Sequence, residues 1–198
     1  FPGRMDERSA ERPTKVAKFM VGSVAGDDAL AQHASGLEYD TSYERGRELV
    51  LAAVRQDGRA LCDASAELKG DRAVVLAAVS QNGSALSHAS VELQGDREVG
   101  LAAVAQLGYA LQWVSAELKG DWEVVLAAVT QNPWALQCAS ADLQRDRELV
   151  LTAVSQGEDA LQYVPEELKG DREVVLMAVV QNGRALQFAS AELKGDRE

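Results

Sequence analysis

Histidine, cysteine and carboxylate side chains are the groups that could carry catalysis or hold a metal. The chain has two histidines, His33 and His88, and two cysteines, Cys62 and Cys138. None of them stands among carboxylates at metal-ligand spacing, so we expect each histidine to have a surface or capping role. The sequence shows no phosphate loop, calcium loop or dinucleotide glycine motif. We therefore predict no catalytic residue, no metal site and no cofactor, and a protein that is not an enzyme.

The charge balance of the chain limits the partners it can have. The 198 residues carry a formal net charge of −11. Such a chain is not expected to bind nucleic acid or an anionic lipid surface through bulk charge. The longest apolar run is too short to cross a bilayer, so we expect no transmembrane segment. Protein subunits remain as the expected partners, including those of a membrane complex approached from its periphery.

A repeat of 25 residues organises most of the sequence, and its unit reads approximately DREVVLAAVxQNGxALQxASxELKG. Leucines mark the spacing at Leu51, Leu76, Leu101, Leu126, Leu151 and Leu176. The register continues without an insertion from residue 47 to residue 198. A unit of this size cannot bury its apolar face alone, whereas stacked units share one core. The sequence predicts an all-α fold, an α-solenoid of about seven short two-helix repeats.

The residues ahead of this array follow the repeat only loosely. Residues 15–46 are interpreted as a degenerate N-terminal capping repeat plus a linker. Ala29-Leu30 matches the alanine–leucine pair of the unit, but it precedes Ala60-Leu61 by 31 residues, six more than the period of 25. The stretch Tyr39–Gly46 is expected to absorb the difference. Residues 1–14 are polar and charged, so they are expected to form an extended arm or a disordered tail. The end of the chain, Asp196–Glu198, repeats the start of a unit, so we expect the protein to continue there or to leave its last face open.

Caps and prolines locate the elements within one unit. Aspartates such as Asp71 precede the apolar run and should begin a first helix of about ten residues, helix A. Pro133 follows Asn132, which indicates that helix A ends there and that a short second helix, helix B, begins at Pro133. Pro165 replaces a serine of the other units and indicates a separate turn after helix B. That turn is either α-helical or 3₁₀.

Two variable positions of helix B, four residues apart, are predicted to share one exposed face. The first column reads Arg59, Ser84, Tyr109, Trp134, Asp159 and Arg184, and the second reads Asp63, His88, Trp113, Cys138, Tyr163 and Phe188. Trp122 stands on helix A where most units have arginine. Because aromatic side chains anchor protein interfaces, we predict partner binding by Tyr109, Trp113, Trp122, Trp134, Tyr163, Arg184 and Phe188.

Two other roles for these rings stay open at this point. Short helices leave gaps, so the rings could fold down between neighbouring helices and cover the aliphatic core. Alternatively Tyr109, Trp113, Trp134 and Tyr163 could form the wall of a pocket for a small molecule or pigment.

The unit resembles a family of tandem helical repeats of unknown function. Residues 121–145 (DWEVVLAAVTQNPWALQCASADLQR) and 171–195 (DREVVLMAVVQNGRALQFASAELKG) carry the pattern, and the resemblance covers residues 47–198. Gly100, Pro133, Gly157-Glu158 and Pro165 depart from it. The family is found in algal and protist proteins and in some bacterial effectors. The resemblance implies a repeat array and assigns no activity and no catalytic residues.

These observations favour a non-catalytic scaffold for protein–protein interaction. The distribution of the resembled family suggests one form of it, a peripheral subunit of an organellar assembly such as an algal photosystem, with a plastid location. A small-molecule or pigment carrier is the second hypothesis. The targeting module of a bacterial effector is the third.

Overall fold

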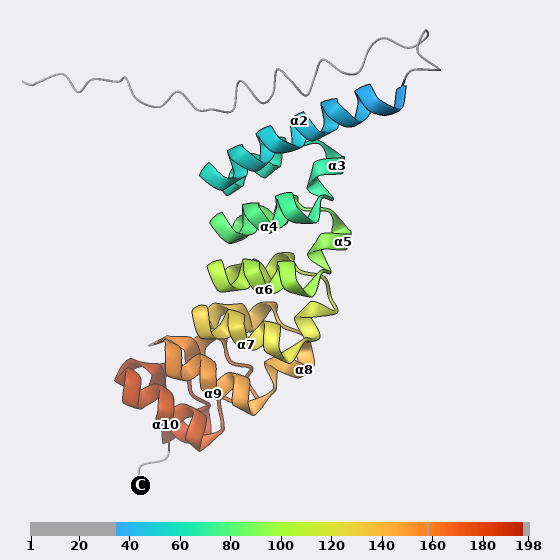
Figure 1. The fold of residues 1–198 in the computed structure, drawn as a ribbon. Helices are drawn as coiled ribbons and strands as arrows, with labels where there is room; N and C mark the ends of the chain where they lie inside the picture. The colour runs from blue at the N-terminus through green and yellow to red at the C-terminus, as the bar shows by residue number, and fades with distance from the viewer. Residues whose placement is uncertain (1–34, 158, 196–198) are drawn as a thin grey trace, which may run out of the picture.

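The computed structural model describes residues 35–157 and 159–195, and each element in these ranges is a helix. Figure 1 shows the helices stacked one below another as an elongated array. We number its units 1 to 6, as residues 46–70, 71–95, 96–120, 121–145, 146–170 and 171–195. The α-solenoid predicted from the repeat is confirmed. Residues 1–14, and residues 15–34 of the predicted capping repeat, lie outside the described residues.

Helix A is an α-helix in every unit and ends where the sequence predicts. The six helices are α2 (Ser35–Gln56), α4 (Arg72–Gln81), α6 (Arg97–Gln106), α7 (Trp122–Gln131), α9 (Arg147–Gln156) and α10 (Arg172–Gln181). From unit 2 onward an aspartate caps each start. Asp71 accepts hydrogen bonds from the backbone N–H groups of Ala73 and Val74. Each cap supplies an acceptor to N–H groups that have no partner within the helix.

The first of these helices is longer than the repeat predicts. α2 begins at Ser35, so the stretch Tyr39–Gly46 lies inside a helix and is not a separate linker. The segment contains neither proline nor an Asn-Gly break, and nothing in it stops helical hydrogen bonding from continuing into unit 1.

Helix B is a 3₁₀ helix and not an α-helix. The six are η1 (Gly58–Asp63), η2 (Gly83–His88), η3 (Gly108–Trp113), η5 (Pro133–Cys138), η6 (Ala160–Tyr163) and η7 (Gly183–Phe188). Asn132 caps η5 by accepting a hydrogen bond from the backbone N–H of Trp134, and Pro133 occupies the first helical position as predicted. Gly157 has no side chain to provide this cap in unit 5, where η6 is the shortest of the set.

The separate turn after helix B is mostly α-helical. It comprises α3 (Ala66–Lys69), α5 (Val91–Gln94), η4 (Leu118–Gly120), α8 (Ala141–Gln144) and α11 (Ala191–Gly195), so the 3₁₀ option holds in unit 3 alone among these. In unit 1 the N–H of Lys69 donates to the carbonyl of Ser65 at 3.0 Å, which is an α-type bond spanning four residues.

The core is a ribbon of small aliphatic side chains that runs through all units. Val74, Val75, Ala78 and Val79 of α4 are buried, and the corresponding positions of α7 are buried as well. Helix B adds its alanine–leucine pair, as Ala135 and Leu136 in unit 4. No buried polar side chain occurs among the described residues. Each helix A therefore packs between its neighbours, and the surface left for function is the outer side of helix B and the ends of the helices.

Candidate interaction surface

The side chains of the two variable columns of helix B range from half-buried to exposed. Trp113, Cys138 and Phe188 of the second column pack against the core and are half-buried. In the first column Arg59 and Arg184 are exposed. A 3₁₀ helix turns about 120° per residue, so positions four apart are offset by about 120° around the helix axis, and only large side chains meet across this offset, as Tyr109 and Trp113 do. The prediction of one common face assumed α-helical geometry, in which the offset is smaller.

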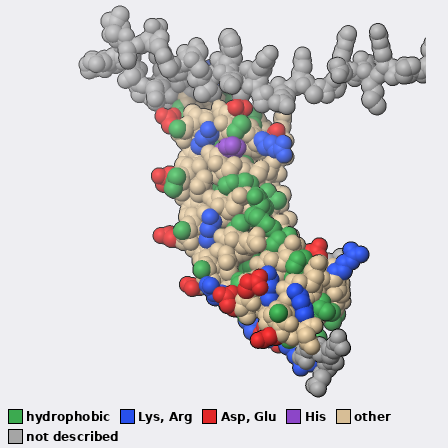
Figure 2. Space-filling model, turned by 180° about the vertical axis from the view of Figure 1, so that it is seen from behind, with side chains coloured by type: hydrophobic (Ala, Val, Ile, Leu, Met, Phe, Trp, Pro, Cys, Tyr) green, Lys and Arg blue, Asp and Glu red, His purple; other side chains and the backbone are tan. Residues whose placement is uncertain are grey.

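Three rings nevertheless form a cluster on the outside of units 3 and 4. The rings of Tyr109 and Trp134 stack with centroids 4.4 Å apart and planes 29° apart. Trp113 meets Tyr109 edge-on, with centroids 5.8 Å apart. All three side chains are half-buried, so each ring keeps one part in solvent. We call this set the aromatic cluster, and Figure 2 shows hydrophobic side chains gathered in a band along the middle of the face seen there.

The remaining predicted residues do not join the cluster. Tyr163 lines a shallow open groove between units 4 and 5, together with Gln137, Gln144, Gln162, Val164, Pro165 and Glu166. Phe188 and Arg184 lie two and more units away along the array, in η7. Trp122 lies at the start of α7 and packs against the core. The structure thus brings together three of the seven predicted residues.

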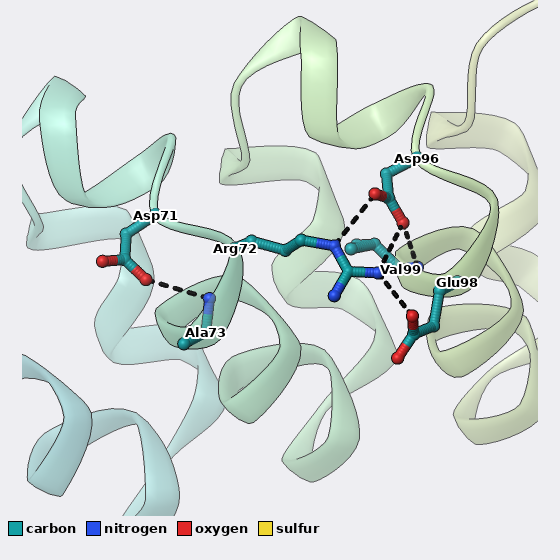
Figure 3. Close-up of polar contacts among 6 residues, drawn as sticks. All are labelled: Asp71, Arg72, Ala73, Asp96, Glu98 and Val99. Atoms are coloured by element: carbon teal, nitrogen blue, oxygen red, sulfur yellow. Dashed lines mark hydrogen bonds and ion pairs between the residues drawn. The ribbon is translucent and has the colours of Figure 1, made fainter.

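A ladder of ion pairs between units was not predicted from the sequence. The guanidinium of Arg72 donates from Nε to Asp96 at 3.0 Å and from Nη2 to Glu98 at 2.5 Å (Figure 3). Arg97 pairs in the same way with Asp121 and Glu123. The same contact joins Arg47 to Asp71 and Arg147 to Asp171 and Glu173. The spacing of 24 residues between Arg and Asp was visible in the sequence, but only the packing of the units gives it meaning.

The ion pairs of the ladder shift the pKa values of the side chains that form them. The hydrogen bond from Arg72 lowers the pKa of Asp96, and the bond from Arg97 lowers the pKa of Asp121. The pKa of the arginine rises correspondingly. The arginines of these two pairs are 46–47% exposed and the aspartates 26–27%, so solvent screens each pair and it stabilises the array modestly. The carboxylates thus cap helices and link units.

Backbone hydrogen bonds form a second link between units. The N–H of Ser90 donates to the carbonyl of Lys69 in the preceding unit, at 2.9 Å. The same bond joins Ser115 to Gln94, Ser140 to Lys119, and Ser190 to Lys169. The serine also caps the short turn in unit 1, where the hydroxyl of Ser65 accepts a hydrogen bond from the N–H of Leu68. The backbone N–H of the serine column has the further role of joining adjacent units.

The glycine at the start of helix B marks a third contact between units. A Cβ on Gly58 would lie 2.4 Å from the carbonyl oxygen of Ala78, and one on Gly108 would lie 2.4 Å from that of Ala128. The N–H of Gly58 also donates to Oε1 of Gln81 at 2.6 Å. In units 1 to 3 glycine fits this position because the backbone approaches the next helix A too closely for a side chain.

The fold and surface define a class, an α-solenoid built from 25-residue repeats. A family model described as "Domain of unknown function (DUF4116)" matches residues 47–94, 96–144 and 146–194, each match covering two units. The chain belongs to this family. No curated protein and no solved structure matches the chain. Among the described residues, none of the helices is long and apolar enough to cross a membrane, and no three His, Cys, Asp or Glu side chains gather where they could hold a metal ion.

Proposed function

We propose that the protein is a non-catalytic scaffold that binds another protein through the aromatic cluster of units 3 and 4. The observation that carries the proposal is the packing of Tyr109, Trp113 and Trp134 at a half-buried outer position. Rings held by one another lose little conformational freedom when a partner binds, so most of the contact area they offer contributes to affinity.

The geometry of the cluster favours a protein partner over a small flat ligand. Ring centroids 4.4 Å apart are already in contact, so no ligand ring fits between Tyr109 and Trp134. The charge of the whole chain adds a preference of its own, because a net charge of −11 favours a basic partner. A peripheral subunit of an organellar assembly, with a plastid location, is the form of this role that the family's distribution favours.

Recovery of protein partners from an extract of the native cells tests the proposal. The bait variant Tyr109→Ser/Trp134→Ser removes the stacked pair from the first column. The matched control Arg59→Ser/Arg184→Ser alters the same column in units 1 and 6, where the side chains are exposed. We expect wild type and control to recover the same partner and the aromatic variant to lose it, with unchanged helical circular dichroism. Equal recovery by all three baits contradicts the proposal.

A further inference from the structure

Among the described residues, one interface between units lacks both the arginine–aspartate ion pair and the backbone hydrogen bond from serine that the other interfaces share. It lies between unit 4 and unit 5, at residues 121–145 and 146–170. In the ladder, Trp122 stands where Arg72 and Arg97 stand, and an indole has no guanidinium to bind Asp146 and Glu148. α7 and α9 are therefore not joined by the ion pairs that join α4 to α6 and α6 to α7.

The backbone link between units is lost at the same place. Pro165 occupies the position of Ser90, Ser115, Ser140 and Ser190, and proline has no N–H to donate. The carbonyl of Gln144 thereby loses the donor that the carbonyl of Lys119 has in the preceding unit. An exposed ion pair, from Arg145 to Glu167 at 3.4 Å, crosses the interface here. Such a pair between two largely exposed side chains stabilises little.

The close contact at the start of helix B is altered there as well. Pro133 stands where units 1 to 3 have glycine. Because proline has no backbone N–H, Pro133 cannot donate a hydrogen bond to Gln156, and its ring occupies space that glycine leaves empty. The ring lies against Gly157, where an added Cβ would be 3.0 Å from Pro133 Cγ. In Figure 1, α4, α6 and α7 run nearly level, whereas α9 and α10 run obliquely to them.

The following interface differs from this one. Arg147 binds Asp171 and Glu173 across it, and the N–H of Ser190 donates to Lys169. Units 5 and 6 are thus linked to each other as units 1 to 4 are. The apolar ribbon continues through all of them, with Leu149 and Val150 fully buried. Apolar packing is less directional than hydrogen bonding, so it holds the two bodies together and constrains their relative angle less than the missing polar contacts would.

We propose that the interface between units 4 and 5 is a hinge on which residues 146–195 turn relative to residues 46–145. The proposal does not depend on the role of the aromatic cluster. The shallow groove has one wall from Gln137 and Gln144 and the other from Gln162 to Glu166, so it lies across the hinge and changes width when the angle changes. A hinge of this kind absorbs motion at few residues and leaves both bodies rigid.

Distances between pairs of spin labels, measured by electron–electron double resonance on the full chain, test the hinge. Ser80, Thr130 and Val180 occupy one exposed position in units 2, 4 and 6. Both label pairs, 80/130 and 130/180, therefore span two interfaces, and only the second crosses the hinge. The native thiols are first removed by Cys62→Ser and Cys138→Ala. We expect the 130/180 distance distribution to be about twofold wider than that of 80/130. Equal widths overturn the proposal.

Restoring the repeat sequence at the hinge separates a hinge from loosening at the end of the array. The variant Trp122→Arg/Pro133→Gly/Pro165→Ser gives this interface the residues that units 2 and 3 use, so it is expected to fold. We expect its 130/180 distribution to narrow to the width of the 80/130 pair. A distribution that stays wide in this variant overturns the proposal, because the missing contacts are then not the cause.

Discussion

Nε of Arg97 lies 2.9 Å from Oδ2 of Asp121, across 24 residues of sequence and one boundary between units. The same carboxylate accepts hydrogen bonds from the N–H groups of Glu123 and Val124 at the start of α7. One side chain thus begins a helix and joins that helix to its predecessor. This double use explains why aspartate recurs at this position, although serine or asparagine would serve as well for capping alone.

Replacing this aspartate is expected to separate the two roles. Asp121→Asn keeps a capping oxygen but loses the charge that pairs with Arg97. Asp146→Asn makes the same change where Trp122 leaves no arginine to pair. We expect Asp121→Asn to lower the free energy of unfolding by about 0.5–1 kcal/mol more than Asp146→Asn does, the scale of an exposed ion pair. Urea unfolding followed by circular dichroism measures both, and equal losses contradict the prediction.

The ladder also predicts how stability depends on pH. Arginine lowers the pKa of Asp96 and Asp121 in the folded state, whereas the same groups in the unfolded chain titrate near their ordinary value. Their stabilisation is therefore complete above the unfolded pKa, near pH 4, and is lost as the pH falls through the lower folded pKa. We expect the urea concentration at the unfolding midpoint to decrease as the pH is lowered below about 4. The decrease should be smaller in Arg97→Gln than in wild type. If the midpoint of Arg97→Gln decreases as much as that of wild type, groups outside this ion pair cause the loss of stability at low pH.

The repeat architecture could be predicted from the sequence because each structural unit corresponds to one period of the sequence. A 25-residue repeat with aspartate caps and an Asn132-Pro133 break defines helix A and its end. The geometry of helix B was not accessible in the same way, since a segment of six residues has too few turns to distinguish 3.0 from 3.6 residues per turn. That difference decides where Trp113 lies around the helix axis relative to Tyr109, although the two rings still meet.

The contacts between units were the other feature that could not be predicted from the sequence. Arg72 and Asp96 are 24 residues apart, and their meeting depends on how adjacent units stack. Each departure from the repeat was visible as a single substitution. Their common location became clear only when the structure placed Trp122, Pro133 and Pro165 at one interface. A repeat sequence therefore shows which positions vary, and the structure shows which variations act together.

The leucine of helix B is expected to contribute unequally along the array. Leu136 is fully buried between units 4 and 5, whereas Leu186 of the last described helix B is 42% exposed. Truncating a buried leucine removes apolar contact and leaves a cavity, so Leu136→Ala should cost about 2–5 kcal/mol. Leu186→Ala has less buried area to lose and should cost clearly less. Urea unfolding of the two variants measures the difference, and similar losses would show that unit 6 is covered in solution.

The close approach of neighbouring units gives a prediction for glycine. A Cβ on Gly83 would lie 2.5 Å from the carbonyl oxygen of Ala103 and 2.9 Å from Cβ of Leu107. Both obstacles are fixed parts of the next unit, so Gly83→Ala must push the two units apart. Overpacking of this kind costs about 1–3 kcal/mol.

Gly183 provides the control, because no atom lies within 4 Å of a Cβ placed there. Gly183→Ala also reduces the conformational entropy of the unfolded chain, which is expected to stabilise by about 0.4–1 kcal/mol. The same substitution at one repeat position should therefore act with opposite sign in units 2 and 6. The two midpoints of thermal unfolding check this, and a loss of stability in both variants would mean that glycine is needed at this position for the local backbone and not for the approach of the next unit.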